Sequence, residues 1–233
     1  MEIYKNIEIV DLSLYLKKEK ILVLSDFQIG HEEYLNKQGI LLPRLEFNDV
    51  IKRLDKIFKK VNPEKIIING DLKHEFGTIS KQEWRNTLDL LDYLLEKAEV
   101  ILVKGNHDVI LGPIANKRNL EIVDYYKIND IAFLHGDKIL LDALNSKILI
   151  IGHEHPAINL KEGVRKELYK CFLKGKYKNK ILIVQPSFNL LTEGSDVLKE
   201  KFSSPFLNQN LNNFEVFVVA DKVYYFGKIK NLA

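Results

Sequence analysis

Six polar side chains with oxygen or imidazole donors each follow a short apolar run of the chain. They are Asp26, Asp71, Asn106, His135, His153 and His155. Carboxylate, amide and imidazole groups are common ligands of divalent cations in proteins. Two such cations can clamp a phosphoryl group and lower the pKa of a water between them, so that hydroxide forms near neutral pH. The residue types therefore indicate a hydrolytic site with two divalent metal ions.

The apolar runs before these residues have the length and composition of buried strands. They include residues 7–10, 21–25, 65–69, 100–104, 131–135 and 147–152. The first two, split by the polar stretch LKKEK, are expected to be adjacent strands. Apolar positions at intervals of three and four predict helices over residues 45–61 and 80–98, the second capped by Ser80. Strands alternating with helices indicate an α/β fold with its site at the carboxyl ends of the strands.

Two further patterns complete the expected architecture. Gly70, Gly105 and Gly152 stand beside residues of the polar set, where glycine would let the backbone turn tightly. After His155 the pattern becomes antiparallel, with hairpins expected over residues 166–184 and 214–226 that turn at residues 174–176 and 220–222. These strands suit an extension of the same fold, so residues 1–233 are expected to form a single domain.

Composition and termini restrict the classes of protein that fit the chain. The 233 residues are 46% hydrophobic and 29% charged, which is typical of a folded globular protein. The single cysteine, Cys171, can form no internal disulfide, and no Cys-x-x-Cys pair is present to hold structural zinc. The first 20 residues interrupt their apolar positions with charges, so neither a signal peptide nor a membrane span is expected. A cytoplasmic location without a membrane partner is the resulting expectation.

Five short motifs occur in a fixed order after the apolar runs: SD, NGDL, KGNHD, LHGD and IGHEHPA. In this order they resemble the motifs of calcineurin-like metallophosphoesterases over about residues 26–156. The resemblance implies a metallophosphoesterase fold, a two-sheet αββα sandwich with mixed strands. It also implies two divalent metal ions as cofactors. Mn²⁺ is expected, and Ni²⁺, Mg²⁺, Zn²⁺ or iron would also suit such a site.

The resemblance assigns a role to each motif position. Asp71 would bridge the two metals, and Asn106, His135 and His153 would complete one site. Asp26 and His155 would hold the other, together with position 28. His107 and Asn106 would contact the phosphate. His107 would protonate the leaving oxygen, with Asp108 orienting its ring, and such general acid help is worth about 100- to 10,000-fold in rate.

Three residues near the motifs are less regular. Gln28 stands where the family usually has histidine, and its amide oxygen could ligate a hard ion such as Mn²⁺ or act through a water. His74 follows the bridging aspartate and could touch substrate, support the ligands or only cap a loop. His31 could replace the missing histidine, but its position favours the start of a following helix.

The substrate is indicated less directly than the reaction. The stretches GDLKHEFG, GHEHPA and VQPSFNLLTEGSD resemble small phosphoesterases related to recombination and break-repair nucleases and to ligase-associated DNA exonucleases. Residues 161–180 hold eight basic and two acidic side chains, with Tyr169, Phe172 and Tyr177 between them. Such a segment could bind nucleic acid through phosphate contacts and base stacking, or it could be a lysine-rich exposed face with inward aromatics.

These observations leave three classes of function open. The leading hypothesis is a phosphodiesterase acting on nucleic acid or nucleotide diesters, as a nuclease or 3′-end-processing enzyme on single-stranded DNA. The alternative is a small-molecule or cyclic nucleotide phosphodiesterase or a phosphomonoesterase. The third is a non-catalytic binding subunit that has lost the chemistry, for which Gln28 is the main argument. No protein partner follows from the sequence.

Overall fold

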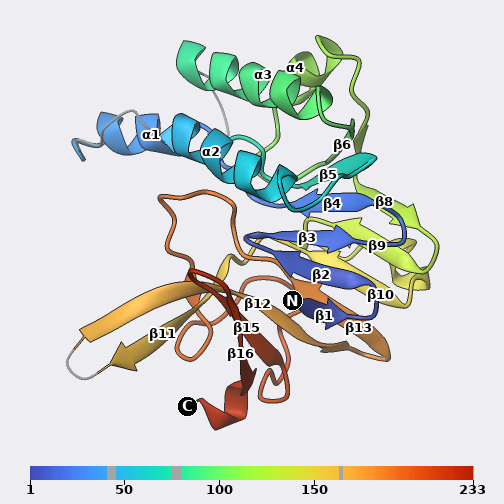
Figure 1. The fold of residues 1–233 in the computed structure, drawn as a ribbon, viewed down its shortest axis with the longest axis vertical. Coiled ribbons are helices and arrows are strands. Elements are labelled where there is room, and N and C mark those ends of the chain that lie inside the picture. Colours follow the sequence, from blue (N-terminus) through green and yellow to red (C-terminus); the bar gives the residue numbers. More distant parts are fainter. Residues whose placement is uncertain (41–45, 75–79, 163–164, 233) are drawn as a thin grey trace.

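The computed structural model describes residues 1–40, 46–74, 80–162 and 165–232 and contains two mixed β-sheets. Within these residues, four α-helices gather at one end of the molecule, while the last two strands and the carboxyl terminus lie towards the other end (Figure 1). The expected α/β fold with two sheets of mixed strands is confirmed. Among the described residues, no helix is long and apolar enough to span a membrane.

The first sheet has seven strands in sequence order. They are β1 (Glu2–Tyr4), β2 (Ile7–Val10), β3 (Ser13–Leu16), β4 (Ile21–Leu24), β5 (Lys65–Asn69), β6 (Glu99–Val103) and β7 (Ile122–Val123). Strands β1 to β4 are antiparallel, whereas β4, β5, β6 and β7 are parallel. The expectation that residues 7–10 and 21–25 are adjacent strands is wrong, because β3 lies between them. Its sequence SLYL contains Ser13 and Tyr15 among the apolar residues, which hid the strand.

The second sheet follows the order β14, β11, β12, β13, β10, β9, β8, and β15 and β16 branch from β12. Its strands are β8 (Tyr125–Ile128), β9 (Ile131–Leu134), β10 (Ile148–Ile151), β11 (Pro156–Glu162), β12 (Arg165–Tyr177), β13 (Lys180–Val184), β14 (Ser195–Asp196), β15 (Glu215–Val219) and β16 (Val223–Lys228). Strands β9, β10 and β13 are parallel neighbours. Their carboxyl ends therefore meet at one edge, like those of β4, β5 and β6.

The two hairpins expected near the carboxyl terminus differ in outcome. The pair β15 and β16 turns at residues 220–222 as predicted. The turn expected at residues 174–176 is wrong, because β12 continues to Tyr177 and the chain turns at Lys178, which has a φ of 54°. Gly175 lies within the strand. Glycine is needed there because a Cβ would be 2.5 Å from ring atoms of Phe214. The glycine thus reflects close packing rather than a turn.

The helices carry the amphipathic patterns seen in the sequence. They are α1 (His31–Lys37), α2 (Glu46–Phe58), α3 (Lys81–Leu95) and α4 (Gly112–Asn116). The helices predicted over residues 45–61 and 80–98 correspond to α2 and α3, which end three residues earlier than expected. Ser80 caps α3 as predicted, since its side chain accepts a hydrogen bond of 3.0 Å from the Glu83 N–H. Short helix α4 was not predicted.

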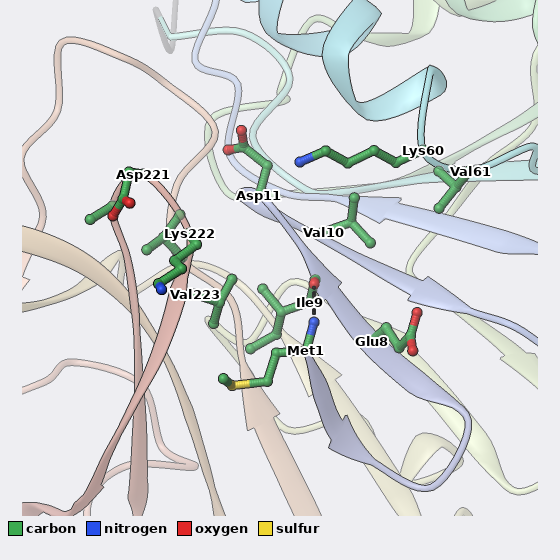
Figure 2. Close-up of a pocket in the computed structure, with 12 residues that line it drawn as sticks. Met1, Glu8, Ile9, Val10, Asp11, Lys60, Val61, Asp221, Lys222 and Val223 are labelled. Atoms are coloured by element: carbon green, nitrogen blue, oxygen red, sulfur yellow. Dashed lines mark hydrogen bonds between the residues drawn. The ribbon is translucent and has the colours of Figure 1, made fainter.

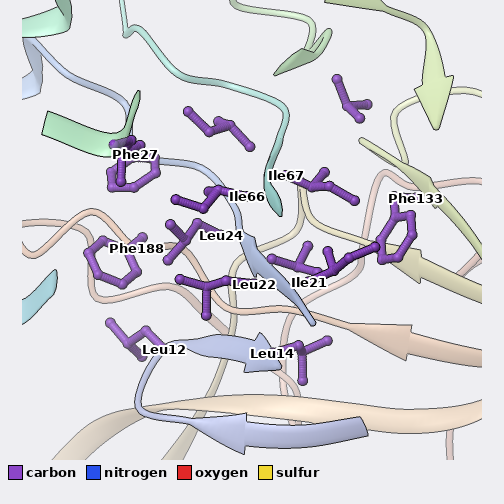
Figure 3. Packing of buried hydrophobic residues seen from close by; sticks show 14 of the residues in the cluster. Leu12, Leu14, Ile21, Leu22, Leu24, Phe27, Ile66, Ile67, Phe133 and Phe188 are labelled. Carbon is purple, nitrogen blue, oxygen red and sulfur yellow. The ribbon is translucent and has the colours of Figure 1, made fainter. Parts of the chain in front are cut away.

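Two apolar clusters cover the two faces of the second sheet. The larger contains residues of both sheets and of helices α2 and α3, including Leu24, Phe27, Ile66, Phe133 and Phe188 (Figure 3). The smaller lies on the other face of the second sheet, where Phe206, Leu207 and Phe214 pack on β10, β12 and β13. Among the described residues of that outer layer, the chain forms 3₁₀ turns and irregular segments where the expected sandwich would place α-helices.

A pocket with a cavity volume of about 390 Å³ lies between β2, the chain after α2 and the β15–β16 hairpin (Figure 2). Its lining includes Met1, Ile9, Asp11, Lys60 and Lys222. The amino-terminal nitrogen donates a 3.0 Å hydrogen bond to the Ile9 carbonyl there. None of the candidate ligands lines this pocket, so it is separate from the strand ends that carry them.

Candidate metal centre

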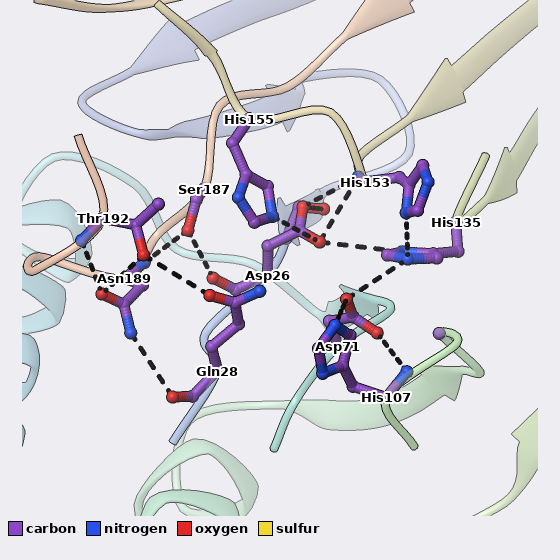
Figure 4. Close-up of polar contacts among 12 residues, drawn as sticks. Asp26, Gln28, Asp71, His107, His135, His153, His155, Ser187, Asn189 and Thr192 are labelled. Carbon is purple, nitrogen blue, oxygen red and sulfur yellow. Dashed lines mark hydrogen bonds and ion pairs between the residues drawn. The ribbon is translucent and has the colours of Figure 1, made fainter. Parts of the chain in front are cut away.

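The carboxyl ends of five strands from the two sheets bring the candidate residues together. Strand β4 leads to Asp26 and Gln28, β5 to Asp71, β6 to Asn106 and His107, β9 to His135, and β10 to His153 and His155. Figure 4 shows the side chains of Asp26, Asp71, His135 and His153 pointing toward one another. The structure therefore brings the candidate residues together at the strand ends, as the sequence predicted.

The backbone around these side chains is unusual. Five of the seven candidate ligands have positive φ angles between 45° and 71°: Asp26, Gln28, Asp71, His153 and His155. Non-glycine residues rarely adopt the left-handed region, at which the side chain meets its own backbone. Each such residue costs of order 1–3 kcal/mol unless local contacts compensate, and residues of this kind cluster at functional sites. The strand ends are thus bent so that short side chains can face a common centre.

Glycines at the strand ends permit close approach between motifs. A Cβ on Gly105 would lie 2.1 Å from Asp71 Oδ1, and a Cβ on Gly152 would lie 2.4 Å from Asp26 Oδ2. Only Gly70 also has a positive φ, of 88°, and a Cβ there would meet the His135 ring at 2.1 Å. The tight-turn role expected of all three glycines therefore applies to Gly70 alone. Gly105 and Gly152 are required because a candidate ligand from a neighbouring strand end packs where their Cβ atoms would be.

One half of the centre is organised around His135. Its Nε2 lies 2.8 Å from Asn106 Oδ1, 3.4 Å from Asp71 Oδ2 and 3.1 Å from His153 Nδ1. One ligand atom from each of Asp71, His135 and His153 falls in a group whose members are all within 4.8 Å of one another. A single ring nitrogen carries at most one proton, which cannot satisfy both Asn106 Oδ1 and Asp71 Oδ2, whereas His153 Nδ1 donates or accepts according to its tautomer. A divalent cation shared by these atoms would satisfy them all, so the residues fit a metal ion.

The charges around His135 also favour a bound cation. Burial would lower the pKa of His135, but the carboxylates of Asp71 and Asp26 raise it to about 9. The His135 Nδ1 atom is buried and has no hydrogen-bond partner among the residues that the structure describes. Two buried carboxylates thus create an environment that favours positive charge. A bound cation would supply that charge in place of a proton.

The other half of the centre is organised around Asp26, which is fully buried. Its carboxylate accepts hydrogen bonds of 2.5 Å from Ser25 Oγ and 3.2 Å from the His153 N–H, and lies 3.3 Å from His155 Nε2. Burial would raise the pKa of Asp26, but His155 and His135 lower it to about 2. Asp26 is therefore an anion at neutral pH, as a metal ligand must be.

Gln28 is held by its neighbours rather than by Asp26. Its backbone N–H donates 2.9 Å to the Asp71 carbonyl, and its Oε1 lies 3.4 Å from Thr192 Oγ1 (Figure 4). Oxygen and nitrogen of an amide exchange places when the group is turned over. The side chain can therefore present either atom to the centre without leaving its position.

His107 and Asp108 have separate partners. The backbone N–H of His107 donates 2.9 Å to Asp71 Oδ1, and its Nδ1 lies 2.6 Å from the His74 carbonyl. The carboxylate of buried Asp108 accepts hydrogen bonds from the N–H groups of Leu72, Lys73 and Gly105. These contacts differ from the expected one, in which Asp108 orients the His107 ring. Asp108 instead ties together the loops after β5 and β6, and the His74 carbonyl meets the ring.

The two remaining histidines lie beside His107. His74 follows β5, and its ring centroid is 5.7 Å from that of His107 and 4.4 Å from that of His31. His31 is the first residue of α1, as its position in the sequence favoured. The His31 side chain contacts Thr192, Asn189 and the rings of Tyr34 and His74.

A segment that the sequence did not single out for the site, residues 185–192, supports the loop after β4. Ser187 Oγ donates 2.7 Å to the Asp26 carbonyl, and the Phe188 N–H donates 2.8 Å to the Ser25 carbonyl. Asn189 Nδ2 donates 3.1 Å to the Phe27 carbonyl, and Thr192 reaches Gln28. Ser187 and Asn189 are fully buried. Buried polar residues in an otherwise apolar stretch were the available signal, since such groups require partners.

The basic segment presents few aromatic faces. Phe172 is fully buried, and the Tyr177 ring packs on Phe206 with centroids 4.9 Å apart. Lys174 and Lys180 donate hydrogen bonds to the carbonyls of Ile3 and Ser146. The side chains of Lys161 and Arg165 lie outside the described residues. For Phe172 and Tyr177, the arrangement is the inward-facing alternative.

Comparisons with known proteins agree with this geometry. A family model described as calcineurin-like phosphoesterase matches residues 19–209. The solved structure of the nuclease MPE from Pseudomonas putida superposes with a TM-score of 0.66 and 18% identity, covering 93% of this chain and 92% of that one. This likeness shows a shared fold. Two further structures are less similar. One is the E. coli phosphoesterase YfcE, with a TM-score of 0.43, 13% identity and coverage of 89% and 97%. The other is a protein of unknown function from Aquifex aeolicus, with a TM-score of 0.40, 24% identity and coverage of 58% and 78%.

Proposed function

The chain belongs to the calcineurin-like phosphoesterases, a family of metal-dependent phosphoester hydrolases, and from this premise we propose that it is a dinuclear phosphodiesterase that cleaves single-stranded nucleic acid. Mn²⁺ is the metal we propose, since the oxygen ligands of the centre suit a hard divalent ion. A single domain and a cytoplasmic location remain predictions from the sequence.

The proposal assigns the residues to two metal positions. Asn106, His135 and His153 would hold one ion and Asp26, His155 and Gln28 the other, with Asp71 between the two. Bound there, the ions would supply charge neutralisation for the phosphoryl group and a water activated at neutral pH. The observation that carries the proposal is the convergence of three atoms that can ligate a metal on His135 Nε2, at 2.8, 3.1 and 3.4 Å. A scaffold without metal would gain nothing from that arrangement.

In this proposal His107 would supply the proton that the leaving oxygen needs. Because a carbonyl only accepts, the proton between His107 Nδ1 and the His74 carbonyl belongs to the ring nitrogen. Nε2 is then the ring atom on the side of Asp71, 3.8 Å from its Oδ2. Nε2 carries a proton only when the ring is the doubly protonated cation, and that proton would be transferred to the leaving oxygen, leaving a neutral ring with its proton on Nδ1. The His74 carbonyl keeps the ring in this orientation throughout.

Two observations favour a nucleic acid as the substrate. The Pseudomonas putida protein that shares the fold is a nuclease, according to the description of its structure. The segment of residues 161–180 carries +6 in a chain whose net charge is +3, and the β11–β12 hairpin that holds much of it projects from the molecule in Figure 1. Basic segments attract the phosphate backbone whatever its sequence.

The test measures cleavage of labelled single-stranded DNA and of small chromogenic mono- and diesters by protein loaded with Mn²⁺, Ni²⁺, Mg²⁺ or Zn²⁺. We expect DNA cleavage with Mn²⁺ and a loss of about 100- to 10,000-fold in His107→Ala, the range for removal of a general acid. Asn106→Ala should also lose turnover, and of the two variants only Asn106→Ala should lose bound metal. Asn208→Ala, an exposed position, is the matched control for the asparagine variant.

Other outcomes would point to the remaining candidates. Cleavage of small esters without cleavage of DNA under any metal would replace the nuclease with a small-molecule phosphodiesterase or phosphomonoesterase. Metal binding without turnover of any ester would favour the non-catalytic binding subunit. Failure of this protein to bind any divalent metal would contradict the whole proposal.

A further inference from the structure

Three rings form a cluster next to His107 that the proposed chemistry does not use. Tyr34 and His31 come from the first turn of α1, and His74 comes from the loop after β5. Ring centroids are 4.4 Å apart for His31 and His74, 4.8 Å for Tyr34 and His74, and 6.5 Å for His31 and Tyr34. Tyr34 is 39% exposed, so the cluster reaches the surface. It extends from solvent to a ring that stacks on His107 at 5.7 Å.

The backbone beneath the cluster is fixed at several points. The His74 N–H donates 2.9 Å to the Ile29 carbonyl and lies 3.2 Å from Glu83 Oε1. Residue Gly30, the N-cap just before α1, has a φ of 100°, and a Cβ there would lie 2.8 Å from the Glu83 side chain. The loop after β5 and the start of α1 are thus packed against α3. A ring cluster held in this way is preorganised, which lowers the entropic cost of binding a flat ligand.

The polar atoms of the cluster suit an uncharged aromatic ligand. Burial, together with His31 and His107, lowers the pKa of His74 to about 4, and burial also lowers the pKa of His31. Both rings are therefore neutral at neutral pH. The buried His74 Nδ1 has no hydrogen-bond partner among the described residues, although it can donate or accept one. A nucleobase offers both a flat face and polar edges.

We propose that His31, Tyr34 and His74 bind the base of the nucleoside on the leaving-group side of the scissile phosphodiester. This inference rests on the proposed function, because the side is fixed by His107. If His107 protonates the leaving oxygen, the leaving nucleoside lies against His107, and the next ring beyond it is His74. The cluster takes the role for which Phe172 and Tyr177 are less suited, since Phe172 is fully buried and the Tyr177 ring packs on Phe206.

The experiment combines a change in the protein with a change in the DNA. A single abasic residue is moved through a short labelled single-stranded oligonucleotide, and kcat/KM is measured at each cut for the Mn²⁺-loaded protein and for Tyr34→Ala. Base stacking on an aromatic side chain commonly contributes enough for about a tenfold effect. We expect the abasic residue to lower wild-type cleavage about tenfold at one of the two positions that flank the cut. Tyr34→Ala should lose about as much on intact DNA.

The decisive result is the combination of the two changes. If the base and Tyr34 act on each other, the abasic residue should cause no further loss in Tyr34→Ala, as in a double-mutant cycle. Tyr34→Phe keeps the ring and should therefore retain the loss at the abasic residue that Tyr34→Ala abolishes. Tyr225→Ala removes a tyrosine that is 53% exposed on β16 and serves as the control. Losses that simply multiply, or equal cleavage of abasic and intact sites by the wild type, would overturn the base subsite and leave the nuclease proposal standing. Wild-type protein that cleaves no DNA would overturn both.

Discussion

The two halves of the candidate metal centre contain similar ligands but are supported differently. Around His135, the ligands leave the ends of β5, β6, β9 and β10 and meet directly, with bare glycine backbone letting them approach. Around Asp26, the ligands depend on a segment more than 160 residues away in the sequence, since Ser187 and Asn189 bond to the carbonyls of residues 26–28. Figure 4 shows this second support on the side of Gln28.

The two halves are expected to differ in how strongly substitutions outside the ligand set affect metal binding. The His135 half is held by the strands themselves, whose parallel pairing fixes where each chain end lies. Left-handed backbone angles occur in both halves, at Asp71 and His153 as well as at Asp26 and Gln28, whose φ angles are 56° and 47°. What distinguishes the Asp26 half is that a distant segment holds the carbonyl groups of its loop. The angles at Asp26 and Gln28 persist because surrounding hydrogen bonds hold the carbonyl groups of the loop. We therefore expect the Asp26 half to be the weaker metal site and the more sensitive to residues outside the ligand set.

The largest expected effect comes from removing one histidine from each half. His135→Ala should lower the bound metal by at least one ion per chain and lower turnover by about 1,000-fold or more, because the Lewis-acid contribution is worth several kcal/mol. His155→Ala should release metal from the Asp26 half alone, so that one ion per chain remains. Metal content by elemental analysis and turnover of a diester distinguish the two.

An equal loss of metal in His155→Ala and His135→Ala would contradict the expected difference between the two halves. Both variants need a check of folding by circular dichroism and thermal melting, because His135 is buried. Asn208→Ala, at an exposed position, is the control for metal content.

Much of the His135 half could be predicted from the sequence. Short apolar runs followed by Asp71, Asn106, His135 and His153 indicate parallel strands with polar ends, and parallel strands bring their ends to one edge. The fold class follows from the same alternation of strands and helices. The predicted cap at Ser80 and the β15–β16 turn depend on local chemistry, which a sequence displays directly.

What the sequence could not show depends on contacts between distant residues. The support from Ser187 and Asn189 requires β13 to bring residues 185–192 alongside the loop after β4, which no local pattern reveals. Gly175 resembled a turn residue, although its lack of a side chain serves packing against Phe214. The partner of His107 is a backbone carbonyl, that of His74, and carbonyl groups carry no signature in the sequence.

The next largest expected effect comes from removing the support that residues 185–192 give to the Asp26 half. Asn189→Ala removes the donor to the Phe27 and Gln28 carbonyls and the acceptor of the Leu191 and Thr192 N–H groups. Loss of support of this kind typically lowers metal affinity 10- to 100-fold. We expect that loss at the Asp26 half only, measured by calorimetric titration of metal-free protein. Asn208→Ala should leave both affinities unchanged, and an equal loss in both halves would show that the support is general.

The smallest expected effect is a gain in the Asp26 half. Gln28→His replaces a neutral amide with imidazole, a better ligand for divalent transition metals, and should raise affinity there by up to about tenfold. Thr192 lies 3.4 Å from Gln28 Oε1 and 3.5 Å from His31 Nδ1, so it can also orient a ring at position 28. Titration with limiting Mn²⁺ should show the wild type filling the His135 half first and the variant filling both halves more evenly. Equal filling in the wild type, unchanged by the substitution, would mean that Gln28 does not set the difference between the halves.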